Sequence, residues 1–383
     1  MKIAFAHDVF PAGGAEMVTL KIADSLPDFD FFVLCNRFVE KNLVGSHPNI
    51  SFLHTGPIGS FDRRDDIIRH IKEHHIDILV MISECVRGAE LIKTETECSL
   101  VVVCHGEPFW QKDYFAPRDK RRWWGRIIGS KGVYFIYENM GLAVKKAIGK
   151  TMKDLRICDK YICLCEEYCK IIKEKITESS LTDKLGFIYN SQAVPETINY
   201  EKDQIVLFCG RIDNLSKRVD LLIDIWKRCQ EKMVGWRLVI AGDGPDREAM
   251  ERYAADSGLK NYEFKGHCNN TQVLYDRASI LALTSATEGW PLALTEAKAN
   301  GVIPVAFNCS AGVRTILSAE EDMGFLIDCF DTQKFADTLI DISKMDGNHL
   351  ANIRRALVED IRNFSPESIA QEWRSLFQSM NRK

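Results

Sequence analysis

The sequence has no hydrophobic segment long enough to cross a membrane. A membrane-spanning helix needs about eighteen consecutive apolar residues or more, and no stretch of the chain provides them. The first apolar run extends only from Ile3 to Ala6, which is too short for a secretory signal peptide. We therefore expect a cytoplasmic protein that is soluble or, at most, attached to the inner face of the cytoplasmic membrane.

The chain also lacks the cysteine spacing of a zinc site. None of its 13 cysteines forms a C-x-x-C pair. Cys163, Cys165 and Cys169 lie in or near an apolar run, which favours buried, reduced thiols over metal ligands. The odd number of cysteines argues against a disulfide framework and agrees with a reducing cytosol.

Charge and glycine patterns argue against two further classes of protein. The formal net charge is −4, so no overall basic excess indicates a nucleic-acid partner. The stretch Pro11-Ala12-Gly13-Gly14 does not have the G-x-G-x-x-G spacing of a Rossmann dinucleotide site. With 383 residues, 46% of them hydrophobic, the chain has the size and composition of a globular protein of two or three domains.

Short apolar runs alternate with amphipathic segments through both halves of the chain. This alternation predicts right-handed βαβ units and parallel sheets, and therefore an α/β fold with two Rossmann-like domains. The periodicity stops at a polar stretch that we interpret as a linker. A last helix begins at Ser365-Pro366-Glu367, a typical helix N-terminus, and has one apolar face. The expected parts are residues 1–190, the linker 191–203, residues 204–363 and the C-terminal helix in 364–383.

One stretch of the second half places two carboxylates in a distinctive setting. An apolar run at 280–283 predicts a buried strand, and Pro291 suits the first turn of the helix that follows. Glu288 then lies on the loop after the strand, and Glu296 lies within the first two turns of the helix. Ligands of open α/β sheets bind at this edge, and a helix N-terminus favours a phosphate. A carboxylate on each side would suit the two sugars of a nucleotide-sugar. The alternative is a pair of ordinary surface acids.

A second set of charges follows another predicted strand. The apolar run at 204–209 leads into Gly210-Arg211, and Lys217 comes a few residues later. The planar guanidinium of arginine and the compact ammonium of lysine can both neutralise a diphosphate. We expect them at the same edge of the sheet as Glu288, although the sequence alone also allows surface charges without a role.

The first half contributes two candidate features at its own sheet edge. Gly13 and Gly14 follow the first strand and precede an amphipathic run, so their backbone could approach a phosphate at the helix start. The alternative for these glycines is a tight turn between strand and helix. His105 follows the apolar run at 100–104, and we place it in the active site. The alternative is a histidine bonded to a neighbouring loop.

Taken together, these motifs resemble those of the retaining glycosyltransferases of family 4. The resemblance rests on the E-x7-E pair Glu288 and Glu296 in its Glu-Gly-Trp-Pro…Glu-Ala context, on Gly-Arg…Lys, and on the turn Gly242-Asp243-Gly244-Pro245. It covers nearly the whole chain. It implies the GT-B architecture, in which two Rossmann-like domains face a deep cleft and a C-terminal helix packs back on the first domain.

The resemblance also implies an activity and roles for individual residues. The expected reaction moves a hexose-type sugar, with retention, from a nucleotide-sugar (UDP being preferred) to a glycan or lipid-linked glycan in bacterial cell-surface polysaccharide synthesis. Glu288 would bind the transferred sugar, and Arg211 and Lys217 would stabilise the departing diphosphate. His105 would contact the donor sugar. Neither a cofactor nor a metal is expected, because the two cations neutralise the diphosphate. The donor-binding residues would be Gly13, Gly14, Gly210, Arg211, Lys217, Gly242, Gly289, Trp290, Pro291, Leu292 and Glu296.

Two other functions remain open on this evidence. Another GT-B enzyme, such as a sugar-nucleotide epimerase or a phosphorylase, would share the fold, but epimerases lack the combination of Gly-Arg…Lys with E-x7-E. A non-catalytic nucleotide-sugar-binding subunit would tolerate the loss of Arg211, Lys217, Glu288 or Glu296, and this chain has all four.

Two further motifs concern membranes and metals. The segment 118–131 holds six basic residues and one acid, with Trp123 and Trp124 among them, and predicts contact with an anionic membrane or a lipid-phosphate acceptor. The alternative is a solvated helix flank whose tryptophans pack inward. Asp28-Phe29-Asp30 matches the D-x-D metal motif of the other large glycosyltransferase fold. We interpret it as turn chemistry, because it lies between a helix and an early strand.

Overall fold

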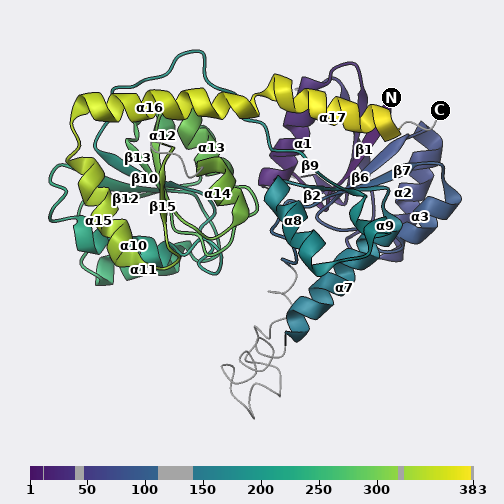
Figure 1. Ribbon diagram of the computed structural model, residues 1–383, viewed down its shortest axis with the longest axis horizontal. Coiled ribbons are helices and arrows are strands. Elements are labelled where there is room, and N and C mark those ends of the chain that lie inside the picture. Colours follow the sequence, from purple (N-terminus) through teal and green to yellow (C-terminus); the bar gives the residue numbers. More distant parts are fainter. Residues whose placement is uncertain (12, 39–46, 111–140, 318–322, 381–383) are drawn as a thin grey trace, which may run out of the picture. The chain divides into compact units, whose positions relative to one another are not determined.

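The computed structural model describes residues 1–11, 13–38, 47–110, 141–317 and 323–380. The chain divides into two units, of which unit 1 contains Met1–Tyr189 and Ile369–Lys383 and unit 2 contains Asn190–Ser368. Each unit is a parallel β-sheet covered by helices (Figure 1). The predicted α/β fold with two Rossmann-like domains is thereby confirmed. The basic segment 118–131 lies outside the described residues.

Unit 1 is built around a seven-stranded parallel sheet with the strand order β5-β3-β1-β6-β7-β8-β9. The order reverses between β1 and β6, which are hydrogen-bonded neighbours. The strands are β1 (Lys2–Ala6), β3 (Asp30–Cys35), β5 (Ile50–His54), β6 (Ile78–Ile82), β7 (Ser99–Val103), β8 (Lys160–Cys163) and β9 (Leu185–Phe187), and a separate pair is formed by β2 (Val9–Phe10) and β4 (Arg37–Phe38). The helices are α1 (Gly14–Ser25), α2 (Phe61–His74), α3 (Ala89–Glu95), α7 (Leu142–Ile157), α8 (Glu166–Lys175) and α9 (Ser179–Thr182).

Helix α2 connects the edge strand β5 to the central strand β6. It begins after Ser60, whose hydroxyl accepts a hydrogen bond from the backbone N–H of Arg63 at 3.1 Å and so caps the helix. It ends at His75, which adopts the left-handed conformation (φ 53°) typical of the residue after a helix. Its buried face includes two polar side chains, Arg63 and His70. Both of these need hydrogen-bond partners to offset the cost of their burial.

Unit 2 is built around a six-stranded parallel sheet with the strand order β12-β11-β10-β13-β14-β15. In chain order this is 3-2-1-4-5-6, the order of doubly wound nucleotide-binding folds. The strands are β10 (Ile205–Cys209), β11 (Arg237–Ala241), β12 (Tyr262–Gly266), β13 (Ile280–Leu283), β14 (Ile303–Phe307) and β15 (Phe325–Ile327). The helices are α10 (Val219–Cys229), α11 (Arg247–Asp256), α12 (Gln272–Arg277), α13 (Leu292–Ala299), α14 (Ala311–Leu317), α15 (Thr332–Ser343), α16 (Gly347–Ile361) and the short 3-10 helix η2 (Arg362–Phe364).

Helices cover both faces of the unit 2 sheet, which explains why its central strands are largely apolar, whereas the edge strand β12 contains Glu263 and Lys265. Helix α10 packs with α15, and α13 packs with α16 (Figure 1). Strands covered on both faces have no polar side, so β14 is buried at every position. Trp226 on α10 is 1% exposed, and its indole N–H donates to the carbonyl of Lys260 at 2.9 Å. Because helices cover both faces of the sheet, the polar side chains that could form a site lie on the loops at the strand ends.

The C-terminal helix, α17 (Pro366–Met380), completes unit 1. Its Phe377 ring packs against Phe29 with centroids 6.2 Å apart. Arg374 donates to both carboxylate oxygens of Asp28, at 2.5 and 2.7 Å, and these hydrogen bonds lower the pKa of Asp28. Asp28 of the D-x-D sequence is thus bound to an arginine of α17. None of the described helices, α17 included, combines the length and the apolar character that crossing a bilayer requires.

Candidate active site

The candidate site of unit 2 lies at the carboxyl ends of β10 and β13. These strands are neighbours in the sheet, and the strand order reverses between them. Arg211 and Lys217 lie on the loop after β10, and Glu288 lies on the loop after β13. The carboxyl edge at such a reversal is where open α/β sheets bind their ligands. The predicted side chains therefore share the expected edge.

Hydrogen bonds hold the two loops together. The backbone N–H of Ala286 donates to the carbonyl of Ser216 at 2.7 Å. The hydroxyl of Thr284 donates to the carbonyl of Lys217 at 3.1 Å. Thr284 is fully buried, so this bond also satisfies a polar group that water cannot reach. The two loops consequently act as one support for the charged side chains.

Lys217 and Glu288 form an ion pair at the centre of this edge. The Nζ of Lys217 lies 2.6 Å from Oε1 of Glu288, and the hydroxyl of Ser285 donates to the same oxygen at 2.6 Å. The side chain of Glu288 is 8% exposed and that of Lys217 is 25% exposed. A carboxylate buried this deeply needs charged and hydrogen-bonded partners, and these two residues supply them. The sequence-predicted pair is thus in direct contact.

Arg211 differs from its neighbours because it is exposed. Within the described part of the chain, no carboxylate forms an ion pair with its guanidinium. Lys217, by contrast, is bound to Glu288. An arginine fork at a sheet edge with no carboxylate partner is suited to a phosphate or diphosphate, which it can bind through two parallel hydrogen bonds.

Glycines let the loop after β11 pack closely on the loop after β10. Gly242 has a φ of 141°, and a Cβ atom there would lie 1.8 Å from the carbonyl oxygen of Gly210. A Cβ at Gly244 would lie 2.3 Å from the carbonyl oxygen of Ile212. Both distances are far shorter than any van der Waals contact, so the Gly-Asp-Gly turn brings backbone against backbone. Gly242 therefore shapes the loop that carries Arg211.

Helix α13 begins just after the E-x7-E loop. Pro291 is its N-cap, with a φ of −71°, and Leu292 is the first helical residue, so the proline lies one position before the predicted first turn. Trp290 is 5% exposed, and its ring packs edge-on against Phe364 with centroids 5.3 Å apart. Gly289 precedes Trp290 on the same loop. Because the indole anchors the loop, the N-terminus of α13 is fixed near Glu288.

Glu296 has a partner that the sequence did not reveal. The phenol of Tyr275, on α12, donates to Oε2 of Glu296 at 2.8 Å. Tyr275 is 1% exposed, and burial, together with the charge of Glu296, raises its pKa well above the usual value. The tyrosine stays protonated and orients one carboxylate oxygen. Helix α12 has only six residues, too few for a periodic pattern that would have marked Tyr275 in advance.

Histidines gather at the carboxyl edge of the unit 1 sheet. His105 follows β7, and burial lowers its pKa to about 4, with a further contribution from His7. His7 follows β1, and its Nε2 lies 2.9 Å from the hydroxyl of Thr19 while its Nδ1 lies 3.5 Å from Glu16. His105 is therefore neutral at neutral pH. It can exchange hydrogen bonds with a ligand without adding charge.

The predicted glycine loop lies at the start of α1. Gly13 is the N-cap and Gly14 is the first helical residue. Gly13 has an extended backbone (φ −170°), and a Cβ there would meet Glu16 at 3.4 Å, an ordinary contact. The local geometry therefore does not require a glycine at this position, and the predicted phosphate contact of Gly13 and Gly14 stays a prediction.

A recess of about 780 Å³ opens at the same edge of unit 1, where β1 and β6 end. Charged groups of both signs line it, among them Arg63, Glu84, Lys150 and Asp154. Lys150 pairs with Glu84 at 2.5 Å. Asp154 is 3% exposed, its Oδ1 accepts from the backbone N–H of Cys85 at 3.3 Å, and burial raises its pKa to about 6. Its Oδ2 is buried and has no hydrogen-bond partner among the described residues.

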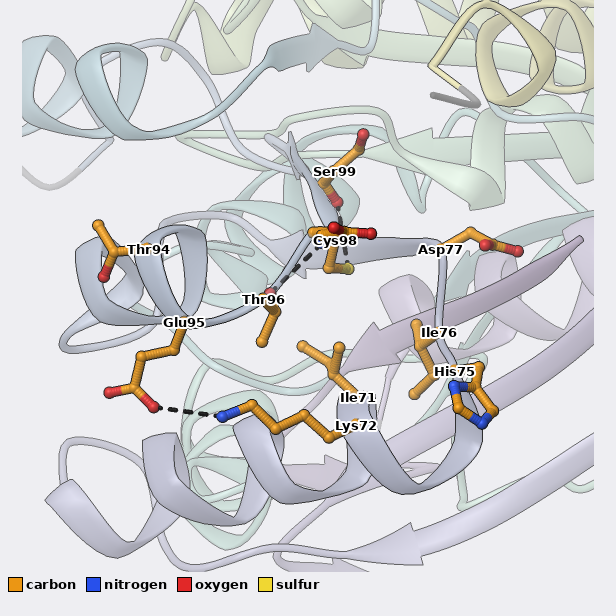
Figure 2. A pocket seen from close by; sticks show the side chains of 11 residues that line it. Ile71, Lys72, His75, Ile76, Asp77, Thr94, Glu95, Thr96, Cys98 and Ser99 are labelled. Atoms are coloured by element: carbon orange, nitrogen blue, oxygen red, sulfur yellow. Dashed lines mark hydrogen bonds and ion pairs between the residues drawn. The ribbon is translucent and has the colours of Figure 1, made fainter. Parts of the chain in front are cut away.

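A second recess, of about 760 Å³, lies at the opposite edge of the unit 1 sheet. Its lining includes Ile76 and Asp77, which precede β6. It also includes Cys98, which precedes β7, and Ser99, the first residue of β7. Figure 2 shows Lys72 of α2 bonded to Glu95 of α3 at its rim, at 3.5 Å. None of the predicted site residues lines this recess. Because parallel sheets bind ligands at their carboxyl edge, we do not assign this recess to the active site.

Residues 191–363 match the family of glycosyl transferases group 1. The chain is similar to an uncharacterised glycosyltransferase of Haemophilus influenzae, with 26% identity over 63% of this chain and 67% of the relative. It is also 26% identical, over 55% of each chain, to a Campylobacter jejuni protein named GalNAc-α-(1→4)-GalNAc-α-(1→3)-diNAcBac-PP-undecaprenol α-1,4-N-acetyl-D-galactosaminyltransferase. The chain thus spans two thirds of the first relative and about half of the second.

The fold has close counterparts among solved structures. HepE from Anabaena, crystallised with UDP and glucose, superposes with a TM-score of 0.75 over 99% of this chain and 100% of HepE, at 16% identity. This likeness confirms the predicted GT-B fold, and the family match confirms the predicted class of enzyme. Residues 191–363 thus match a glycosyl transferases group 1 domain, within a chain of GT-B fold.

Proposed function

We propose that the protein is a retaining glycosyltransferase that moves a hexose-type sugar from a UDP-sugar to a glycan or a lipid-linked glycan. The similarity to HepE, whose crystals contain UDP and glucose, supports the donor. The name of the Campylobacter jejuni relative, which specifies a glycan on PP-undecaprenol, supports a lipid-linked acceptor. The setting we propose is the synthesis of a bacterial cell-surface polysaccharide.

The contact between Lys217 and Glu288 carries this proposal. It places a cation and a carboxylate 2.6 Å apart at the carboxyl edge of the sheet. Arg211 lies on the same loop as Lys217, and α13 begins just after Glu288. The two cations and the N–H groups at the helix start suit a diphosphate. The carboxylate suits sugar hydroxyls, so the set fits a ligand that joins a sugar to a diphosphate.

In the proposed reaction the bond between the sugar anomeric carbon and the phosphate oxygen breaks. An acceptor hydroxyl forms the new bond on the same face of the sugar, and its proton passes to the departing phosphate. Arg211, Lys217 and the amides at the start of α13 stabilise the negative charge that develops on the diphosphate. Such pre-oriented stabilisation is often the largest single term in catalysis. Glu288 holds the transferred sugar, and Glu296, oriented by Tyr275, binds the ribose.

The recess of unit 1 is our candidate for the acceptor. It combines carboxylates such as Asp154 and Glu16 with the cations Lys150 and Lys153. A glycan offers many hydroxyls that both donate and accept hydrogen bonds, so a mixed lining of this kind suits it. The proposed sugar contact of His105 is with the donor, as the resemblance to family 4 implies.

The release of nucleoside diphosphate from a panel of UDP-, GDP- and ADP-sugars tests the proposal. We expect release that depends on an added acceptor, and loss of it in Glu288→Gln. Glu231→Gln is the matched control, because Glu231 is an exposed acid of unit 2 that pairs with Lys260. Turnover without any acceptor would favour an epimerase or phosphorylase instead. Tight binding without turnover would favour a non-catalytic subunit. NMR of the product's anomeric carbon tests retention.

We also propose that transfer needs no metal ion, because Arg211 and Lys217 supply the positive charge. The initial rate should be unchanged in EDTA, and abolished activity would contradict this part of the proposal. The proposed membrane contact through residues 118–131 is tested separately by flotation with anionic liposomes. Absence of binding at low salt would remove it, because electrostatic attraction is strongest there.

A further inference from the structure

Helix α2 carries three potential metal ligands on one face. His70, Glu73 and His74 have the spacing i, i+3 and i+4, which brings side chains of a helix together. Each offers one ligand atom, and these atoms all lie within 4.8 Å of one another. Two histidines at i and i+4 on a helix are a recurrent arrangement in zinc sites. No part of the proposed transferase site uses these residues.

The hydrogen bond of His70 to a backbone carbonyl leaves its other ring nitrogen as a hydrogen-bond acceptor or metal ligand. The side chain is 9% exposed, and Nε2 lies 2.9 Å from the carbonyl oxygen of His54, with Nη2 of Arg69 farther away at 3.5 Å. A carbonyl only accepts, so Nε2 carries the hydrogen, and Nδ1 presents its lone pair. Nδ1 is buried and has no hydrogen-bond partner among the described residues, and Oε2 of Glu73 lies 3.8 Å from it. Buried acceptors without a partner are rare and costly, and a metal ion would satisfy this one.

The remaining two ligands are positioned around this nitrogen. The His74 ring packs on Phe32 of β3 with centroids 5.3 Å apart. It lies 5.9 Å from the His70 ring at an interplanar angle of 31°. The strand thus limits where the His74 ring can turn. Glu73 is exposed, so its carboxylate can rotate toward the two rings without giving up buried surface.

One cation competes for Glu73. Arg69 lies 3.4 Å from Oε2 of Glu73 and 3.0 Å from Asp66. A metal ion at Glu73 would take over the longer of these contacts, and Arg69 would keep Asp66. The contact that is lost joins the exposed side chains of Arg69 and Glu73, where ion pairs contribute little to stability.

We propose that His70 Nδ1, Glu73 and a ring nitrogen of His74 bind one divalent cation of the zinc class. Two imidazoles and a carboxylate are the protein ligands of several zinc sites, with water in the fourth position. The hydrogen bond from His70 to the His54 carbonyl matches the support that metal-binding histidines usually have. The ion would stabilise the last turns of α2, whose first turn holds Arg63 against the carbonyl of His7 at 2.8 Å. None of these three residues belongs to the proposed transferase site, so the metal site is independent of the transfer reaction.

Titration of the full-length, EDTA-treated and dialysed protein with Co²⁺ tests the proposal, and Zn²⁺ should then displace the Co²⁺. We expect one Co²⁺ per chain, visible d–d absorption and no thiolate-to-cobalt charge-transfer band in the near ultraviolet. Zn²⁺ at a hundredfold excess over its Kd should raise the melting temperature by about 5–10 °C. A charge-transfer band would mean that one of the cysteines binds the metal, and it would overturn the proposal.

Variants localise the binding to α2. His74→Gln removes a proposed ligand and should weaken Co²⁺ binding about tenfold or more, since loss of a residue that merely supports a ligand already costs that much. Glu73→Gln should also weaken it, and because Glu73 is exposed this variant guards against a folding defect in the first. His75→Asn is the matched control, since His75 is the adjacent histidine outside the cluster and asparagine tolerates its left-handed backbone. Equal binding by wild type and His74→Gln, or equal loss in His75→Asn, would contradict the assignment.

Discussion

The two units share the strand order 3-2-1-4-5-6, to which unit 1 adds a seventh strand, but they differ in what they place at the reversal point. In unit 2 that edge carries the Lys217–Glu288 pair and an exposed Arg211. In unit 1 it carries a recess lined by charges of both signs, with the carboxylate of Asp154 buried and partly unsatisfied. The same backbone frame therefore supports two different kinds of polar surface.

This difference follows from the chemistry of the ligands that we propose. A diphosphate has the same charge and shape in every nucleotide-sugar, so a small fixed set of cations and amides can serve it. Acceptor glycans differ in size and linkage, and a wide recess with mixed charges suits them. The family match falls on residues 191–363, which form most of unit 2. The recognisable motifs are therefore those of the proposed diphosphate site.

Removing Arg211 should produce the largest effect on activity. Arg211→Ala removes a group that would bind the departing diphosphate, so we expect turnover to fall about a hundredfold or more. Stability should be unchanged, because the side chain is exposed and has no ion pair within the described chain. Steady-state release of nucleoside diphosphate measures the effect. Arg252→Ala is the control, as this exposed arginine of α11 pairs only weakly with Glu248, at 3.8 Å.

Lys217→Met tests stability rather than turnover, because Lys217, unlike the exposed Arg211, is part of a buried ion pair. It leaves the Glu288 carboxylate, 8% exposed, without its cation. Breaking a buried pair costs about 3–5 kcal/mol, and the partial exposure of Lys217 reduces our expectation to about 2–3 kcal/mol. Urea denaturation measures this loss. Adding Glu288→Gln to Lys217→Met should restore part of it, and a purely additive double mutant would contradict the coupling.

Asp154→Asn should stabilise unit 1 at neutral pH. Burial raises the pKa of Asp154 from 3.8 to about 6, which corresponds to about 3 kcal/mol of disfavoured charge. Because the folded protein then binds more protons than the unfolded chain, stability falls as the pH rises through this window. The amide removes the charge but buries an NH₂ group, so we expect a gain of about 1–2 kcal/mol.

The pH dependence of that gain distinguishes its cause. It should be present above pH 6 and disappear below pH 3.8, where the carboxyl group is protonated in both states. Denaturation series at several pH values measure it. A gain that stays constant with pH would show that packing, rather than charge, is responsible.

The smallest effect is expected for the exposed pair that links Asp28 to Arg374. Asp28→Asn removes the charge of an exposed carboxylate, and such pairs contribute little because water screens them. We expect no measurable change in the urea midpoint. A clear loss would mean that this pair contributes measurably to holding α17 in unit 1.

The sequence predicted those parts of the fold and the site that depend on local pattern. Apolar runs located the strands of both sheets, and β13 has the predicted bounds, Ile280–Leu283. Arg211, Lys217 and Glu288 could be placed on one edge because parallel strands end together. The N-terminus of α13 was misplaced by one residue, since Pro291 fits either an N-cap or a first turn.

What the sequence did not predict depends on contacts between distant residues. Tyr275 reaches Glu296 across 21 positions, and nothing local marks it. Asp154 on α7 resembles any exposed helical acid until the fold buries it beside Cys85. In the sequence, His70 is likewise only a polar residue of a predicted helix. Its contact with the carbonyl of His54 is what indicates which ring nitrogen carries the hydrogen. Burial of a polar group depends on tertiary structure, so the hydrophobic periodicity of the sequence cannot predict it.

The discontinuity of unit 1 has a consequence for biosynthesis. Its sheet is encoded before Tyr189, but the part of α17 that covers Phe29 is encoded after Ser368. At about 5–20 residues per second, the ribosome needs on the order of ten seconds or more to translate the intervening chain. During that interval the nascent sheet exposes an uncovered apolar surface, which is a natural binding place for a chaperone and the point where aggregation would begin.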